Sequence, residues 1–180
     1  MATSRAQSAA ASRVLRVGSS GRRVAAGRAL ASRSSKPAQR TRYLIDNSVW
    51  ARLSTTPEVV VALKAVVDLT RPDDVLVCPP IALEIGFGAS TGAGHAALQE
   101  QLSAFPQCSA HPTVEEALGV QSRLWNGGLL RAAGAIDTLI AAYAVKNDAI
   151  VLHYDRDYEH IAAVTPEFRH QWVVPRGSVA

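Results

Sequence analysis

Short apolar runs alternate along most of this chain with longer segments that have helical periodicity. Runs typical of buried strands lie at 43–45, 75–78 and 150–153, and weaker strands are expected at 108–110 and 171–174. Helical patterns occupy the segments between them: 48–54, 57–69, 79–87, 95–105, 114–125, 135–147 and 157–164. Such alternation predicts an α/β fold, with a mostly parallel, Rossmann-like sheet flanked by helices on both faces.

The first 42 residues differ sharply from the rest in charge. They hold ten basic groups and no acid, whereas residues 43–180 hold nine basic and fifteen acidic groups. Without aromatic residues or a sustained apolar face, residues 1–42 are predicted to be a disordered basic extension, followed by one domain at 43–180. Three interpretations of the extension stay open: an organellar transit peptide, a basic arm that contacts RNA phosphates, or a gene start assigned too far upstream.

Several classes of protein are disfavoured by composition. No run of about 18 apolar residues occurs, so neither a transmembrane helix nor a membrane partner is expected. Two cysteines, Cys78 and Cys108, cannot form a disulfide framework or a four-cysteine zinc site, and we expect a reducing, cytoplasmic setting. The five histidines lack H-E-x-x-H spacing, which disfavours a zinc hydrolase.

Four acids fall where a parallel sheet would bring them together. Asp46 directly follows the first strand, and Asp155 lies two residues beyond the strand that ends at His153. Glu84 and Asp137 lie in the first turns of two helices. Sites in such sheets form at the carboxyl ends of the strands, and clustered oxygen ligands favour Mg²⁺ or Mn²⁺. Any one acid alone is more often a helix cap or dipole partner, so the joint pattern carries the argument.

Three more polar residues each have two interpretations. Asp157 either caps the last helix or assists the metal site through D-x-D spacing with Asp155. Ser48 either caps the first helix or reaches a metal-bound water, and Thr138 is either a helix-end hydroxyl or an indirect support of the metal site.

The segments around these acids resemble one known family. They are L-I-D-N-S at 44–48, A-L-E-I at 82–85, I-D-T-L-I-A-A at 136–142 and L-H-Y-D-R-D-Y at 152–158. Their order and spacing resemble the PIN-domain family and, within it, the VapC-type toxins of bacterial toxin–antitoxin pairs. The resemblance covers residues 43 to about 174, and the basic extension departs from it.

The resemblance implies an activity, a cofactor and partners. It implies a Mg²⁺- or Mn²⁺-dependent ribonuclease that is toxic because it cuts RNA, commonly tRNA or rRNA. Asp46, Glu84, Asp137 and Asp155 match the family's metal-binding catalytic acids, and Asp157 matches a further family acid. It also implies a homodimer and a cognate VapB-type antitoxin whose C-terminal segment blocks the active site.

Other functions remain as alternatives. A PIN fold that binds or processes RNA without a toxin role is one, although the intact set of four acids argues against an RNA-binding protein that cannot cut. A Mg²⁺-dependent phosphatase of the haloacid dehalogenase type needs D-x-D after its first strand, and Asp46-Asn47-Ser48 lacks the second acid. A receiver-type signalling module needs an early pair of acids and a late lysine that this chain does not show.

Overall fold

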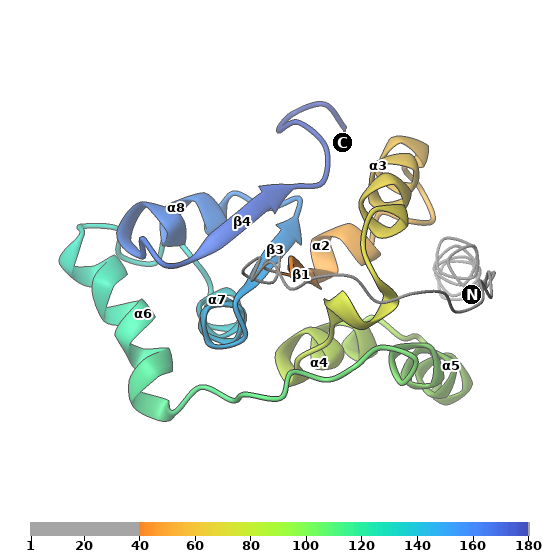
Figure 1. The fold of residues 1–180 in the computed structure, drawn as a ribbon, viewed down its shortest axis with the longest axis horizontal. Coiled ribbons are helices and arrows are strands. Elements are labelled where there is room, and N and C mark those ends of the chain that lie inside the picture. Colours follow the sequence, from red (N-terminus) through yellow and green to blue (C-terminus); the bar gives the residue numbers. More distant parts are fainter. Residues whose placement is uncertain (1–39, 180) are drawn as a thin grey trace, which may run out of the picture.

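Four parallel strands form the centre of the protein in a computed structural model, which describes residues 40–179 (Figure 1). The strands run in the spatial order β2-β1-β3-β4. Their bounds are β1 Arg42–Ile45, β2 Val75–Leu76, β3 Ala149–His153 and β4 Arg169–Trp172. The predicted parallel sheet is therefore confirmed. The predicted disordered extension lies, apart from its last three residues, outside the described residues.

Helices follow the strands in the predicted alternation. Their bounds are α2 Asn47–Trp50, α3 Pro57–Asp68, α4 Pro79–Phe87, α5 Gly92–Leu102, α6 Val114–Asn126, α7 Ala135–Lys146 and α8 Asp157–Val164, with the 3₁₀ turn η2 at Pro72–Asp74. Among residues 40–179, none of these helices has the length and apolar character needed to cross a bilayer.

The sheet separates two hydrophobic clusters because successive strand residues point to opposite faces. On β1, Leu44 belongs to the larger cluster, which also receives buried residues from α4 to α8, while Ile45 belongs to the smaller one with α2 and α3. On β3, Val151 and Leu152 divide in the same way. Figure 1 shows α3 on one side of the strands and α4 and α7 on the other. This two-faced burial fixes the register of the central strands and thus the positions of the residues that follow them.

Several sequence predictions on local structure were wrong: β2 ends at Leu76 rather than 78, and α2 ends at Trp50 rather than 54. Residues 108–110 do not form a strand, and the chain pairs with Val77 only through an isolated bridge at Gln107. The side chain of Asn147 instead bonds both backbone groups of Ala110: its Nδ2 donates to the Ala110 carbonyl (2.8 Å) and its Oδ1 accepts from the Ala110 N–H (3.1 Å). Helix α5 begins at Gly92 rather than 95, because the Thr91 side chain caps it. The last strand lies two residues earlier than expected.

Candidate active site

Asp46 lies at the carboxyl end of β1 and is the N-cap of α2. Only 4% of its surface is exposed, and both of its carboxylate oxygens accept hydrogen bonds. Oδ2 accepts from the Ser48 backbone N–H (2.8 Å), and Oδ1 accepts from the Tyr158 hydroxyl (2.7 Å). Each oxygen keeps a second lone pair, so the carboxylate is held in place and can still accept another hydrogen bond or bind a cation.

The two candidate accessory hydroxyls have structural partners. Ser48 is not the N-cap, because Asp46 occupies that position; its Oγ accepts from the Tyr154 N–H (2.9 Å) and ties α2 to the segment after β3. The buried Thr138 hydroxyl donates to the Ala135 carbonyl (2.8 Å) within the first turn of α7. The helix-end interpretation of Thr138 therefore agrees with its contacts.

One backbone N–H, that of Gly134, links two acids from different helices. It donates to Oδ2 of Asp137 and to Oδ2 of Asp157, at 3.1 Å in each case. Asp157 also donates its own N–H to Oδ1 of Asp155 (3.0 Å). A Cβ atom on Gly134 would lie 2.6 Å from Asp137 Oδ2, so no other residue fits here without moving that carboxylate. The sequence pattern alone gives Gly134 no such role, since a glycine before a helix indicates only a break.

The acids share one electrostatic environment. Burial, together with the negative charges of Asp46, Asp157, Asp155 and Glu84, raises the pKa of the Asp137 carboxyl to about 7. Burial also raises the pKa of Glu84, with added repulsion from Asp46 and Asp155. The four predicted acids and Asp157 thus lie close enough for their charges to affect Asp137, although they come from separate segments of the chain.

The donor chemistry of this site fits a hard divalent cation, although the carboxylates are not preassembled around one. All of the clustered ligands are carboxylate oxygens, which Mg²⁺ and Mn²⁺ prefer. Among residues 40–179, none of the four acids forms an ion pair with a lysine or arginine that would neutralise it. Within the same residues, no group of three His, Cys, Asp or Glu side chains is arranged to hold an ion as it stands. Binding would therefore require rotation of the partly exposed members, Glu84, Asp137 and Asp155.

Comparison with known families identifies this arrangement. The family model of the PIN domain matches residues 43–164, the segment that carries every acid described above. The chain belongs to the PIN-domain family. The resemblance predicted from the four sequence segments is therefore confirmed.

Curated relatives place this PIN domain in the VapC-type group. It is 37% identical over 139 residues to Ribonuclease VapC51 of Mycobacterium tuberculosis (strain ATCC 25618 / H37Rv), a match that covers 77% of this chain and 97% of the relative. It is 30% identical over 140 residues to Ribonuclease VapC18 of the same strain, covering 76% and 98% of the two chains.

A solved structure supports the fold independently. The crystal structure of VapBC2 from Rickettsia felis, bound to a DNA fragment from its promoter, matches with a TM-score of 0.54. The match covers 73% of this chain and 98% of the other at 15% identity, so it supports the PIN fold alone.

Two buried side chains of this PIN domain were missed as contributors to the site. Tyr158 contacts Asp46, and His153 accepts a hydrogen bond from the Asp155 N–H at its Nδ1 atom (3.1 Å). Both lie in the L-H-Y-D-R-D-Y segment, whose acids drew attention while its aromatic residues did not. Tyr158 lies on α8 and His153 at the end of β3, and their roles depend on contacts between these elements that spacing in the sequence does not reveal.

Proposed function

We propose that this chain is a metal-dependent endoribonuclease and the toxin of a VapBC toxin–antitoxin pair. The observation that supports this proposal most strongly is the effect of the neighbouring carboxylates on Glu84 and Asp137. The negative charges of Asp46 and Asp155 add to burial in raising the pKa of both, and none of the four acids has an ion-pair partner among residues 40–179. A divalent cation relieves such repulsion, and two curated relatives, matched over 97% and 98% of their own length, are named ribonucleases.

In this proposal the four acids hold Mg²⁺ or Mn²⁺, and the ion supplies activation of a water molecule and neutralisation of charge on the phosphate. Asp46 contributes a fixed carboxylate, because Tyr158 and the Ser48 N–H set its orientation. Gly134 holds Asp137 and Asp157 at the start of α7 through its shared N–H. Glu84, on α4, is partly exposed, so its side chain has room to rotate toward an ion.

RNA is the proposed substrate, with tRNA or rRNA as its class, and the cytoplasm is the proposed location. A polymer needs an accessible site, and Glu84, Asp137 and Asp155 are each partly exposed at one edge of the sheet. A groove of about 320 Å³ between α4 and α5 is lined by none of the four acids, so it is separate from the proposed cutting site.

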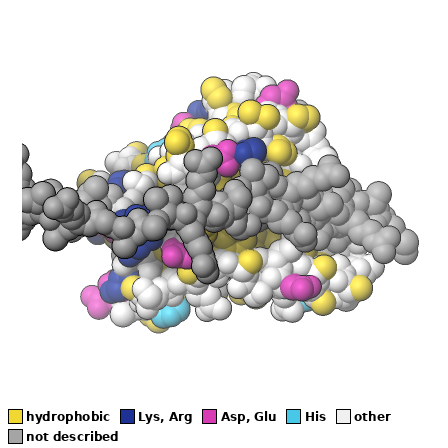
Figure 2. Space-filling view, turned by 45° about the vertical axis from the view of Figure 1, so that its right-hand side comes forward, with side chains coloured by type: hydrophobic (Ala, Val, Ile, Leu, Met, Phe, Trp, Pro, Cys, Tyr) yellow, Lys and Arg dark blue, Asp and Glu magenta, His cyan; other side chains and the backbone are white. Residues whose placement is uncertain are grey.

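A homodimer and a VapB-type antitoxin are the proposed protein partners. Neighbouring exposed apolar side chains support protein contacts, because monomeric domains rarely expose large contiguous apolar patches. On α4, Leu83 is 71% exposed and Phe87 is 93% exposed, one helical turn apart. Figure 2 shows hydrophobic side chains at the surface of the face it presents, with acidic and basic groups interspersed among them.

Cleavage of a labelled tRNA and rRNA mixture by the purified full chain tests this proposal. New RNA ends are expected with Mg²⁺ or Mn²⁺, and none with EDTA. Induced expression should arrest growth, and mapping the new ends in those cells would name the target. An intact RNA pool in the presence of both metals would contradict the proposal, and binding without cutting would favour a PIN domain that only recognises RNA.

A further inference from the structure

The carboxylate of Asp46 is held from within the protein by a tyrosine. Tyr158, on α8, is fully buried, and its hydroxyl donates to Asp46 Oδ1 at 2.7 Å. Burial, together with the neighbouring acids, raises the pKa of Tyr158 well above its ordinary value of 10, so the hydroxyl keeps the proton that it donates. A charge-assisted hydrogen bond of this kind restricts the orientation of a carboxylate.

The backbone at Asp155 is held from within by a histidine. His153 is fully buried at the end of β3, and its Nδ1 accepts from the Asp155 N–H (3.1 Å). Nδ1 therefore carries no proton, and the neutral ring is protonated at Nε2. That Nε2–H donates to Nδ1 of His170 on β4, 2.8 Å away, which fixes His170 as the Nε2-protonated tautomer as well.

Ring packing joins these two supports into one layer, which we call the aromatic support layer: Tyr158, His153, His170 and Phe168. The centroids of His153 and Tyr158 lie 4.8 Å apart, and Phe168 stacks on His170 at 5.9 Å with an interplanar angle of 6°. Phe168 also lies 6.1 Å from Tyr158. The side chains that bond Asp46 and the Asp155 backbone are therefore packed against each other.

We propose that Tyr158 and His153 are positioning residues for the reaction of this PIN domain: Tyr158 orients the Asp46 carboxylate, and His153 fixes the main chain that carries Asp155. The inference rests on the proposed function, because it assumes that these acids bind the ion. It adds that the hydrogen bonds made by Tyr158 and His153 strengthen the binding of the ion at Asp46 and Asp155. Hydrogen bonds to metal-binding side chains commonly change metal affinity by about 10–100-fold.

A single hydroxyl deletion tests the tyrosine. Tyr158→Phe keeps the ring and its packing and removes only the donor to Asp46. Tyr143→Phe is the matched control, because Tyr143 is also buried and its hydroxyl contacts His111 Nδ1 (3.3 Å) rather than an acid. We expect Tyr158→Phe in the full chain to weaken Mn²⁺ binding, measured by calorimetry, about tenfold and to lower kcat with little change in the KM for RNA. Tyr143→Phe should change neither.

A pair of substitutions at the partly exposed His170 tests the hydrogen bond between His153 and His170. His170→Asn keeps an acceptor within reach of the His153 Nε2–H, whereas His170→Leu removes it and allows His153 to release the Asp155 N–H. We expect the leucine variant to bind Mn²⁺ several-fold more weakly than the asparagine variant. Equal Mn²⁺ affinity in these two variants would overturn the role of His153.

The outcomes separate this inference from the proposed function. If the wild-type chain binds Mn²⁺ and cuts RNA, and Tyr158→Phe binds Mn²⁺ within twofold of wild type, the positioning role of Tyr158 is overturned and the proposed function stands. If the wild-type chain neither binds Mn²⁺ nor cuts RNA, the proposed function fails, and this inference fails with it.

Discussion

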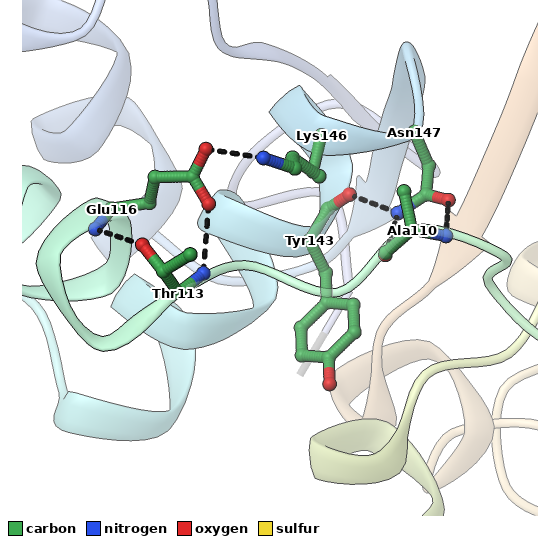
Figure 3. A network of polar contacts seen from close by, with 6 residues as sticks. All are labelled: Ala110, Thr113, Glu116, Tyr143, Lys146 and Asn147. Atoms are coloured by element: carbon green, nitrogen blue, oxygen red, sulfur yellow. Dashed lines mark hydrogen bonds and ion pairs between the residues drawn. The ribbon is translucent and has the colours of Figure 1, made fainter.

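Acidic side chains have basic partners at one end of the sheet and lack them at the other, among residues 40–179. At the amino end of β3, Glu116 pairs with Lys146 and Asp148 pairs with Arg169. Figure 3 shows Glu116 between Lys146 and the Thr113 backbone, so its charge is fully partnered. At the carboxyl end, Asp46 and its neighbouring acids have no basic partner among residues 40–179. This contrast between neutralised acids at one end and unpaired acids at the other is the basis of the proposed cation site.

Helix α7 joins the two ends and shows the contrast within one element. Its N-terminus carries Asp137, where the helix dipole alone would lower the pKa of an acid. The pKa of Asp137 is instead raised to about 7, because burial and the nearby carboxylates outweigh the dipole. At the other end of α7, Lys146 lowers the pKa of Glu116 through a hydrogen bond. The pKa of Glu116 is therefore lowered, as expected for an acid paired with a lysine, whereas the pKa of Asp137 is raised despite its position at a helix N-terminus.

The largest expected difference between the ends is in activity. Asp46→Asn keeps the shape of the side chain and removes its charge, and we expect RNA cleavage to fall by about 10³-fold, the equivalent of several kcal/mol of lost charge stabilisation. Glu115→Gln, at an exposed acid of α6, is the matched control and should stay within twofold of wild type. Initial rates on labelled RNA measure both, and substantial cleavage by Asp46→Asn would remove Asp46 from the site.

The second difference is in the pH dependence of stability. The folded-state pKa of Asp137, about 7, lies above its ordinary value of 3.8, so the folded protein binds this proton more tightly than the unfolded chain does. Without metal, stability should therefore fall as pH rises from about 4 to about 7, by roughly 2–4 kcal/mol from this group. Asp137→Asn should lose that slope and be more stable than wild type at pH 8 in EDTA.

Urea unfolding in EDTA at a series of pH values measures this prediction. Glu115→Gln should retain the wild-type slope, since this exposed acid lies on α6, away from the carboxylate cluster. If Asp137→Asn were no more stable than wild type at pH 8, the crowding of charge at the carboxyl end would be refuted.

The sequence indicated which acids to consider, but it did not indicate the side chains that contact them. Asp46 and Asp155 were singled out because they follow apolar strands, and Glu84 and Asp137 because they lie in the first turns of helices, so local pattern and a rule of parallel sheets led to this prediction. Tyr158 and His153 were missed because their roles arise from contacts with distant segments. The strand expected at 108–110 failed for a similar reason, since Asn147, 37 residues away from Ala110, takes its hydrogen bonds.

A third prediction concerns Asn147, just before the amino end of β3. The buried side chain of Asn147 makes hydrogen bonds to Ala110 and to the Tyr143 carbonyl (2.8 Å), as Figure 3 shows. Asn147→Ala leaves the Ala110 backbone groups without their partner, and we expect a loss of about 2–3 kcal/mol in the free energy of unfolding. Cleavage per folded molecule should be unchanged. Unfolding curves and rate measurements on the same sample separate the two effects, and a specific loss of kcat would show that the two ends are coupled.

The smallest expected effect is at the cap of α6. Thr113 and Glu116 form the capping box that their spacing indicates, with the Thr113 hydroxyl accepting from the Glu116 N–H (3.2 Å). Thr113→Ala should lower the free energy of unfolding by about 1 kcal/mol and the melting temperature by a few degrees. Thermal melts measure the change. The affinity for Mn²⁺ should not change. A parallel loss of this affinity would contradict the independence of the α6 cap from the carboxylates at the carboxyl end of the sheet.

The central claim is that the carboxylates at the carboxyl end of the sheet repel one another until a hard dication joins them. Calorimetric titration of the full wild-type chain with Mn²⁺ at pH 8, beside Asp46→Asn, tests it most directly. We predict saturable binding to wild type. Free Mn²⁺ at 100 times the Kd should stabilise the folded protein by about 2.7 kcal/mol and thus raise its melting temperature. Binding to the variant should be at least tenfold weaker. Absence of binding to folded wild type, or equal binding to both proteins, would contradict the claim.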